Sequence, residues 1–237
     1  MTELEILMNL GLLGSCYIYV IAVILITGRI KYRLSANSSR KFLHIMIGNF
    51  IFVIPFFTLR TFPLSFPFFV AAPFILVTFL FSPLSPVDLS SKISGLAEVT
   101  GEGHRFGLLL YAISYSILAL FFSSKPYVIA AGILPMAYGD AAASLVGQKL
   151  GRHKYDVFGT KSLEGSTVMF AICIFGLMAC LPFFSHLYPI STSNYVLACL
   201  GVASVATICE ALTPKGFDNL TVPLFSAAVF LLTIGGI

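Results

Sequence analysis

Long apolar runs are the feature that most constrains the fold of this chain. A helix of about 20 mostly apolar residues crosses the ~30 Å hydrocarbon core of a bilayer, and its backbone polar groups are satisfied within the segment. We therefore predict an all-α, polytopic integral membrane protein with about eight transmembrane helices. The predicted spans are Leu4 to Thr27, Phe42 to Phe57, Leu64 to Phe81, Phe106 to Phe122, Tyr127 to Gly147, Leu163 to Phe184, Tyr195 to Leu212 and Leu220 to Ile237.

The composition and the first apolar run support this class. Hydrophobic residues make up 58% of the 237-residue sequence and charged residues only 10%, whereas soluble domains carry roughly 25% charged residues. Glu3 and Glu5 precede the first run where a cleavable signal peptide has a basic stretch, so we expect this run to remain as a membrane helix. No low-complexity segment or repeat divides the sequence, and we expect a single membrane-embedded domain over residues 1–237.

The basic residues follow an alternating pattern that predicts the orientation. All 14 Lys and Arg residues except Arg60 and Lys125 lie in the loops after the first, third, fifth and seventh spans. The positive-inside rule places these loops in the cytoplasm and both termini on the non-cytoplasmic side. The net charge of +4 follows from this basic face, so it gives no reason to expect a nucleic-acid partner.

Two carboxylates lie at membrane depth. Asp140 belongs to the fifth span and Glu210 lies near the inner end of the seventh. Ionisable groups inside a membrane are costly, so each is a candidate functional residue. Gly139 and the alanines after Asp140 favour close approach by another helix or by a ligand. A carboxylate that is simply satisfied by a neighbouring helix remains an alternative for both positions.

The loop from Gly147 to Ser166 combines cations with glycines. Cations and exposed backbone amides beside a helix start suit a polyphosphate ligand. Its candidate ligand-binding residues are Lys149, Lys154, Gly159, Thr160, Lys161 and Ser162. The spacing is not that of a Walker A loop. Two simpler roles remain open: the basic side chains set the topology, and Ser162, Glu164 and Ser166 cap the sixth predicted helix.

A third group of candidates starts the second predicted span. Arg40 and His44 lie one helical turn apart on one face, and Lys41 is adjacent. The alternatives are a lipid-headgroup anchor for Arg40 and Lys41, and a hydrogen-bonded core histidine for His44. The turn from Glu210 to Asn219 joins the last two spans, and its carboxylates are ligands suited to Mg²⁺ held between substrate phosphates.

At these residues the chain resembles the CTP-dependent polyprenol kinase family, which includes phytol, farnesol and dolichol kinases and a eukaryotic diacylglycerol kinase branch. The matching elements are Arg40-Lys41-x-x-His44, Gly139-Asp140 with Gly147, Lys161-Ser162-Leu163-Glu164-Gly165-Ser166, Glu210-Ala211 and Asp218-Asn219-Leu220-Thr221-Val222-Pro223. The short chain is more similar to the phytol and prenol kinase branch than to dolichol kinases. A Lys-x-x-Glu-Gly-like element is also similar to membrane phosphatidate cytidylyltransferases.

The resemblance implies transfer of the γ-phosphate of CTP to an isoprenoid alcohol, such as phytol, geranylgeraniol or farnesol, at the cytoplasmic membrane face. The predicted catalytic residues are Asp140, Lys161 and Glu164. The predicted nucleotide- and phosphate-binding residues are Arg40, Lys41, His44, Lys149, Lys154, Gly159, Thr160, Lys161 and Ser162. The predicted Mg²⁺ ligands are Asp140, Glu210, Asp218 and Asn219. Asp140 or Glu164 would orient the acceptor hydroxyl.

Two other functions are compatible with the same residues. A phosphatidate cytidylyltransferase-like enzyme transfers CMP to a lipid phosphate and releases pyrophosphate, so its product is a CDP-lipid where a kinase yields CDP. A non-enzymatic, ion-coupled transporter also uses intramembrane carboxylates. The candidate residues gather on one predicted face and do not line a path between two faces, which favours an enzyme.

Overall fold

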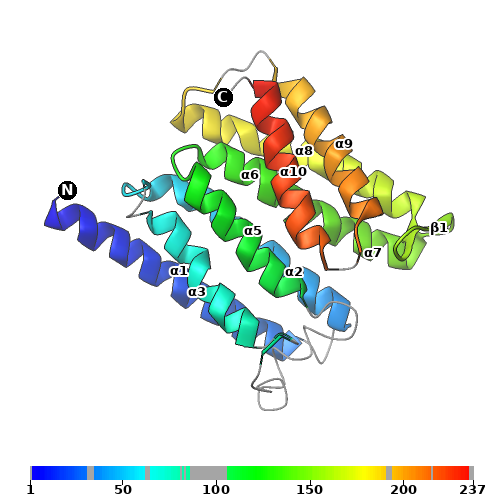
Figure 1. Cartoon of the computed structure of the whole chain (residues 1–237), viewed down its shortest axis with the longest axis horizontal. Helices are drawn as coiled ribbons and strands as arrows, with labels where there is room; N and C mark the ends of the chain where they lie inside the picture. Colours follow the sequence, from blue (N-terminus) through cyan, green and yellow to red (C-terminus); the bar gives the residue numbers. More distant parts are fainter. Residues whose placement is uncertain are drawn as a thin grey trace.

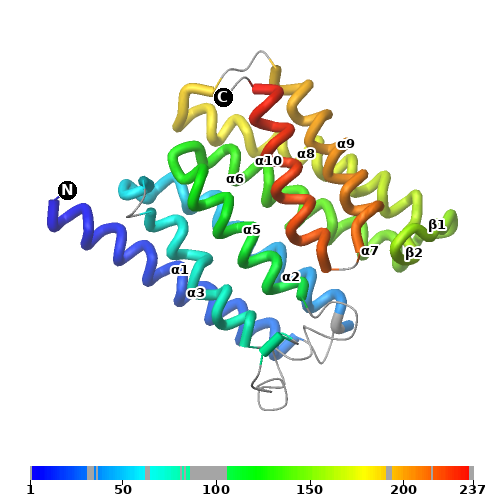
Figure 2. Tube along the Cα trace, viewed as in Figure 1, coloured from blue at the N-terminus to red at the C-terminus, as the bar shows by residue number. Residues whose placement is uncertain are grey.

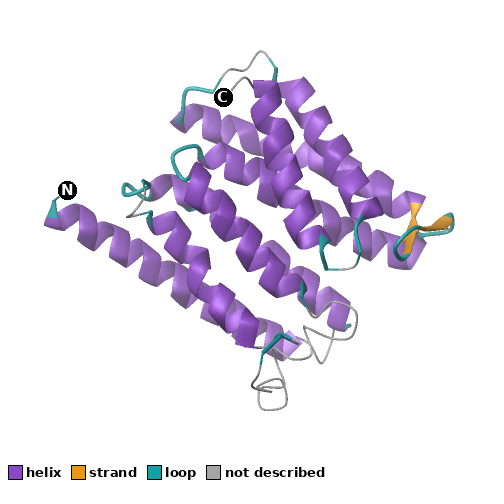
Figure 3. Ribbon diagram, in the orientation of Figure 1, coloured by secondary structure: helices purple, strands orange, loops and turns teal. Residues whose placement is uncertain are grey.

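The computed structural model describes residues 2–30, 35–61, 65–80, 82, 84–85, 106–190, 194–214 and 216–234. Within these ranges the chain forms a bundle of helices that run in roughly the same direction across the view, with a small hairpin at one edge (Figures 1 and 3). Some of the basic residues behind the predicted orientation lie outside the described residues. They are Lys31, Arg33, Lys92, Arg105 and Lys215.

The helices match the predicted spans closely, because each long apolar run folds as one helix or as consecutive helical segments. The first half contains α1 (Glu3–Ile30), α2 (Ala36–Gly48), the 3-10 turns η1 (Asn49–Phe52) and η2 (Ile54–Phe56), α3 (Phe66–Leu80) and α5 (Gly107–Phe122). The second half contains α6 (Pro126–Leu134), the π-helical turn η3 (Pro135–Asp140), α7 (Ala141–Leu150), β1 (Lys154–Asp156), β2 (Thr160–Ser162), α8 (Leu163–Leu187), α9 (Tyr195–Leu212) and α10 (Asp218–Ile234).

Several of these helices meet the requirements of a membrane span. Among the described residues, four helical segments are long and apolar enough to cross a bilayer: α1, the continuous run Pro126–Leu150, α8 and α9. Three shorter helices, α3, α5 and α10, are also apolar. The all-α membrane class is therefore confirmed. The number of crossings and the side on which the termini lie remain predictions.

The run from α6 through η3 to α7 is the centre of the bundle. In the most apolar 18-residue stretch of this run, 78% of the residues are buried inside the protein. The corresponding share is 22% for α1 and 33% for both α8 and α9. The N-terminal helices lie on one side of it and α8, α9 and α10 on the other (Figure 2). Pro135 lies at the start of η3 and lacks a backbone N–H, so the regular hydrogen-bond ladder is interrupted and widens into a π turn. This turn ends at Asp140, which is buried.

Two glycines allow the central run to approach its neighbours closely. A Cβ atom on Gly48 of α2 would lie 2.5 Å from the Cβ of Ala137 in η3. A Cβ atom on Gly165 of α8 would lie 3.0 Å from the carbonyl oxygen of Ala143 in α7. These contacts bring α2 and the start of α8 against the segment around Asp140, and side chains from distant parts of the sequence meet there.

Candidate functional site

A polar cavity of about 380 Å³ lies where α2, η3, α7, the β-hairpin, α8, α9 and the start of α10 come together. It extends along α7 from Asp140 to Gln148, roughly 12 Å at 1.5 Å per residue. Most of the predicted site residues are brought together in its lining. These are Arg40, Lys41, Asp140, Lys154, Thr160, Lys161, Ser162, Glu210 and Asp218.

The inner end of the cavity holds an ion pair between Lys41 and Asp140. The Lys41 ammonium on α2 donates to the Asp140 carboxylate, and the two side chains are only 5% and 7% exposed. Asp140 also interacts electrostatically with Lys161 and His44. A buried charge of this kind is costly unless it is paired, so the contact between α2 and η3 gives each of the two charged side chains its partner in the protein interior.

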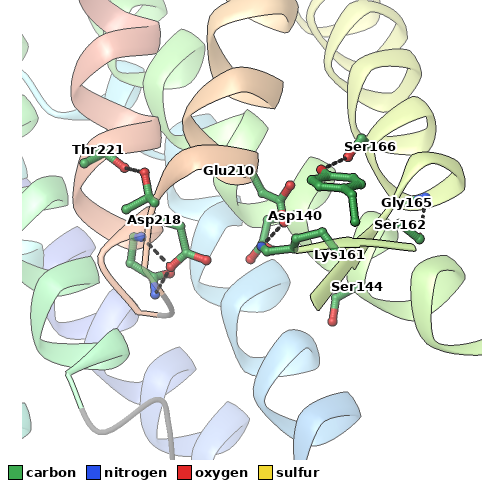
Figure 4. A network of polar contacts seen from close by, with 12 residues as sticks. Asp140, Ser144, Lys161, Ser162, Gly165, Ser166, Glu210, Asp218 and Thr221 are labelled. Atoms are coloured by element: carbon green, nitrogen blue, oxygen red, sulfur yellow. Dashed lines mark hydrogen bonds and ion pairs between the residues drawn. The ribbon is translucent and has the colours of Figure 1, made fainter. Parts of the chain in front are cut away.

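A second ion pair joins the hairpin to α9. Lys161 of β2 donates to the Glu210 carboxylate, and both side chains reach toward Asp140 (Figure 4). Partial burial disfavours the charged ammonium, but the carboxylates of Glu210, Asp140 and Asp218 outweigh this effect and raise the pKa of Lys161 above its ordinary value. Lys161 is therefore a cation at any physiological pH.

The third carboxylate comes from the start of α10. Gly216, with a φ of +93°, makes the left-handed turn that leads into this helix. The Asp218 carboxylate accepts hydrogen bonds from the backbone N–H and the side-chain amide of Asn219, at 3.0 and 3.3 Å. The Asn219 amide also donates to the Gly216 carbonyl at 3.1 Å. Its own Oδ1 atom is buried without a hydrogen-bond partner within the part of the chain that the structure describes.

The β-hairpin supplies the outer wall of the cavity. β1 and β2 are antiparallel, with Lys154 opposite Ser162 and Tyr155 opposite Lys161. The Ser162 hydroxyl accepts a hydrogen bond from the Gly165 N–H at 3.1 Å and caps α8. The capping role predicted for Ser162 is thus confirmed, and the same cap sets the first turn of α8 against the cavity, which Gly165 and Ser166 also line.

Five predicted site residues lie outside the cavity lining. Glu164 points to the hairpin side, where its carboxylate contacts the His153 ring at 2.8 Å. Lys149 is exposed at the end of α7, and Gly159 lies in the turn between β1 and β2. His44 is buried, with its ring 5.0 Å from that of Tyr111, and Asn219 lies behind Asp218.

Four of the described polar residues that line the cavity were not among the predicted site residues: Asn37, Ser144, Gln148 and Ser166. Asn37 donates a hydrogen bond to the Ser144 hydroxyl at 2.9 Å and accepts one from Arg40 at 2.8 Å. Asn37 lies one turn before Lys41 on α2, and Ser144 lies one turn after Asp140. That i, i+4 spacing from a charged candidate was the signal available in the sequence.

The chain is similar to several known lipid kinases. No family model and no solved structure matches it. A phytol kinase of Synechocystis sp. is 34% identical over 224 residues, which is 91% of this chain and 88% of that protein. Phytol kinase 1, chloroplastic, of Arabidopsis thaliana is 28% identical over 96% of this chain and 76% of its own length. CTP-dependent diacylglycerol kinase 1 of Eremothecium gossypii is 28% identical over 62% of this chain and 50% of its own length. These relatives show, in agreement with the residues that line the cavity, that the chain belongs to the CTP-dependent polyprenol kinase family, which includes the phytol kinase-like lipid kinases.

Proposed function

We propose that this lipid kinase transfers the γ-phosphate of CTP to the hydroxyl of an isoprenoid alcohol at the cytoplasmic face of the membrane. The observation that carries the proposal is the polar cavity, whose lining, within the described part of the chain, combines four cations (Arg40, Lys41, Lys154, Lys161) with three carboxylates (Asp140, Glu210, Asp218). The phytol kinases among the relatives support a single-chain prenyl acceptor, and the diacylglycerol kinase supports CTP as the donor.

Phosphoryl transfer requires positioning and charge neutralisation more than covalent chemistry from the protein. Lys41 and Lys161 each form an ion pair with a carboxylate at the cavity. A triphosphate carries several negative charges and accepts hydrogen bonds from ammonium groups. We propose that CTP takes the place of the carboxylates as the partner of these two lysines, and that the lysines then stabilise charge on the phosphates in the transition state.

The carboxylates released in this exchange are suited to Mg²⁺. Mg²⁺ usually binds one or two carboxylates together with water and substrate phosphates, and it seldom occupies a cage made only of protein ligands. In the ranges that the structure describes, no group of three or more His, Cys, Asp or Glu residues is placed to hold a metal ion alone. Asp218 lines the cavity, so its carboxylate is available as an oxygen donor for a metal that arrives with the nucleotide. The Oδ1 of Asn219, the other predicted ligand in this turn, is buried behind Asp218 and does not line the cavity. Mg²⁺ bound there would neutralise phosphate charge.

Asp140 is placed to meet the acceptor. It belongs to a membrane-spanning run, ten residues or about 15 Å before the end of α7, whereas Glu210 lies two residues from the end of α9. We therefore propose that Asp140 lies at the end of the cavity nearer the hydrocarbon core, where a lipid hydroxyl from the bilayer would meet it first. Its carboxylate would then orient the hydroxyl toward the γ-phosphate.

The test is incubation of the purified protein with CTP labelled in the γ-phosphate, Mg²⁺ and a panel of lipid alcohols. We expect a labelled lipid phosphate and stoichiometric CDP with phytol, geranylgeraniol or farnesol. Absence of labelled lipid with every alcohol, in the presence of saturating CTP and Mg²⁺, would contradict the proposal.

A further inference from the structure

A second cavity, of about 70 Å³, lies between α1, α2, α3 and α5. The described residues that line it are all aliphatic or aromatic apart from Thr78. The four helices contribute, among others, Val20 of α1, Leu43 of α2, Ala71 of α3 and Leu108 of α5. We call this cavity the apolar groove.

The apolar groove and the polar cavity both border α2. Arg40 lines the polar cavity, and Leu43, three residues later on the same side of the helix, lines the groove. The His44 ring packs against that of Tyr111, which lines the groove, and His44 interacts electrostatically with Asp140. A molecule whose polar end lies beside Lys41 and Asp140 can therefore extend its apolar end along α2 toward the groove.

The dimensions of the groove favour one chain. A volume of about 70 Å³ holds roughly five to seven water-sized spheres, at 10–15 Å³ for each. Along α5 the lining extends from Leu108 to Tyr115, about 10 Å at 1.5 Å per residue. A space of this volume and length admits a single hydrocarbon chain over several carbons. A second chain beside it would need a larger volume.

We propose that the apolar groove binds the part of the acceptor chain next to the hydroxyl, and that it admits single-chain alcohols and excludes diacylglycerol. This proposal rests on the kinase function proposed above. Diacylglycerol carries two chains that diverge close to its hydroxyl, so it would need a wider site at this position. The acceptor comes from the bilayer and not from water, so the groove contributes selectivity by shape and packing more than by the hydrophobic effect.

A matched pair of variants on α3 tests the groove. Ala71 is buried and lines it, whereas Ala72, the next residue, is only partly buried and lies outside the lining. Ala71→Leu fills part of the groove and should lower kcat/KM for a single-chain alcohol about tenfold or more, since a few methyl groups in a pocket have effects of this size. Ala72→Leu should change it less than about twofold. The KM for CTP and the melting temperature should stay the same in both variants.

A second measurement does not depend on turnover. A single-chain alcohol with a photoreactive diazirine near its hydroxyl should label the groove residues of α2, α3 and α5 in the wild type. Labelling should fall in Ala71→Leu and persist in Ala72→Leu. Label confined to the outer surfaces of α8 or α9, or equal turnover of diacylglycerol and single-chain alcohols, would overturn the groove proposal. A labelled groove without phosphate transfer from any nucleotide would support the groove and overturn the kinase function.

Discussion

Lys41 of α2 and Asp140 of η3 form a buried ion pair, although they are 99 positions apart in the chain. The pair connects the basic start of one helix with the carboxylate at the π turn of the central run. Lys161 and Glu210 repeat this arrangement at the same cavity. The proposed mechanism uses both pairs in the same way, because each provides a lysine for phosphate and a carboxylate for the metal or the acceptor.

Replacement of Lys161 tests the phosphate contact. We expect Lys161→Ala to lower kcat/KM by about 10²- to 10³-fold, because it removes a preorganised cation from a partly dehydrated site. Arg152 is the control, since it is exposed in the same loop and does not line the cavity. Steady-state kinetics should show less than about a threefold change for Arg152→Ala. Near-normal turnover in Lys161→Ala would mean that Lys161 only helps to set the orientation of the protein in the membrane.

Replacement of Asp140 should affect both activity and stability. Asp140→Asn leaves the buried Lys41 ammonium without its partner carboxylate, and breaking a buried pair in this way costs about 3–5 kcal/mol. Activity and stability would then fall together, so the single variant does not separate a catalytic role from a structural one.

A double variant separates the two roles. In Lys41→Met with Asp140→Leu both charges are replaced by apolar groups of similar size, which is often neutral for stability. We expect the melting temperature to return close to that of the wild type while turnover remains lost. If the double variant kept more than about a tenth of normal turnover, the pair would contribute less than ~1.4 kcal/mol to the transition state and Asp140 would not be catalytic.

The close approach of α2 to η3 should depend on Gly48. In Gly48→Ala the new Cβ would lie 2.5 Å from the Cβ of Ala137, so one of the two elements must shift. We expect a loss of about 1–3 kcal/mol in stability and a loss of turnover, because Lys41 moves with α2. Gly11→Ala is the matched control, since no atom lies within 4 Å of its added Cβ. Thermal unfolding should show Gly11→Ala to be at least as stable as the wild type.

The predicted orientation is open to cysteine labelling. Ser124 precedes α6 and Arg152 follows α7, so the two lie at opposite ends of a 25-residue helical run about 37 Å long. The native cysteines are buried except Cys209, which is partly buried, and Cys209→Ala is a suitable background. A membrane-impermeant maleimide should label Arg152→Cys only from the cytoplasmic side and Ser124→Cys only from the opposite side. The reverse pattern would contradict the placement of the cavity on the cytoplasmic face.

The helices were predictable because long apolar runs have few alternatives in lipid. The candidate residues were also predictable one by one, since charges near a membrane and glycines beside them are unusual. The pairing of these residues was not predictable, because no local sequence pattern links Lys41 to Asp140 or Lys161 to Glu210. The hairpin was missed because its strands are three residues long, too short for an alternating pattern. The contact of Glu164 with His153 depends on that hairpin, and it was missed for the same reason.

The position of the isotope in the product tests the central claim most directly. CTP labelled in the γ-phosphate and CTP labelled in the α-phosphate are incubated in parallel with the wild-type protein and either a single-chain prenyl alcohol or phosphatidate, with Lys161→Ala as the inactive control. We predict that only the γ label reaches the lipid and that the α label is recovered in CDP. Transfer of the α label to a lipid, with release of pyrophosphate, would contradict it and identify a cytidylyltransferase.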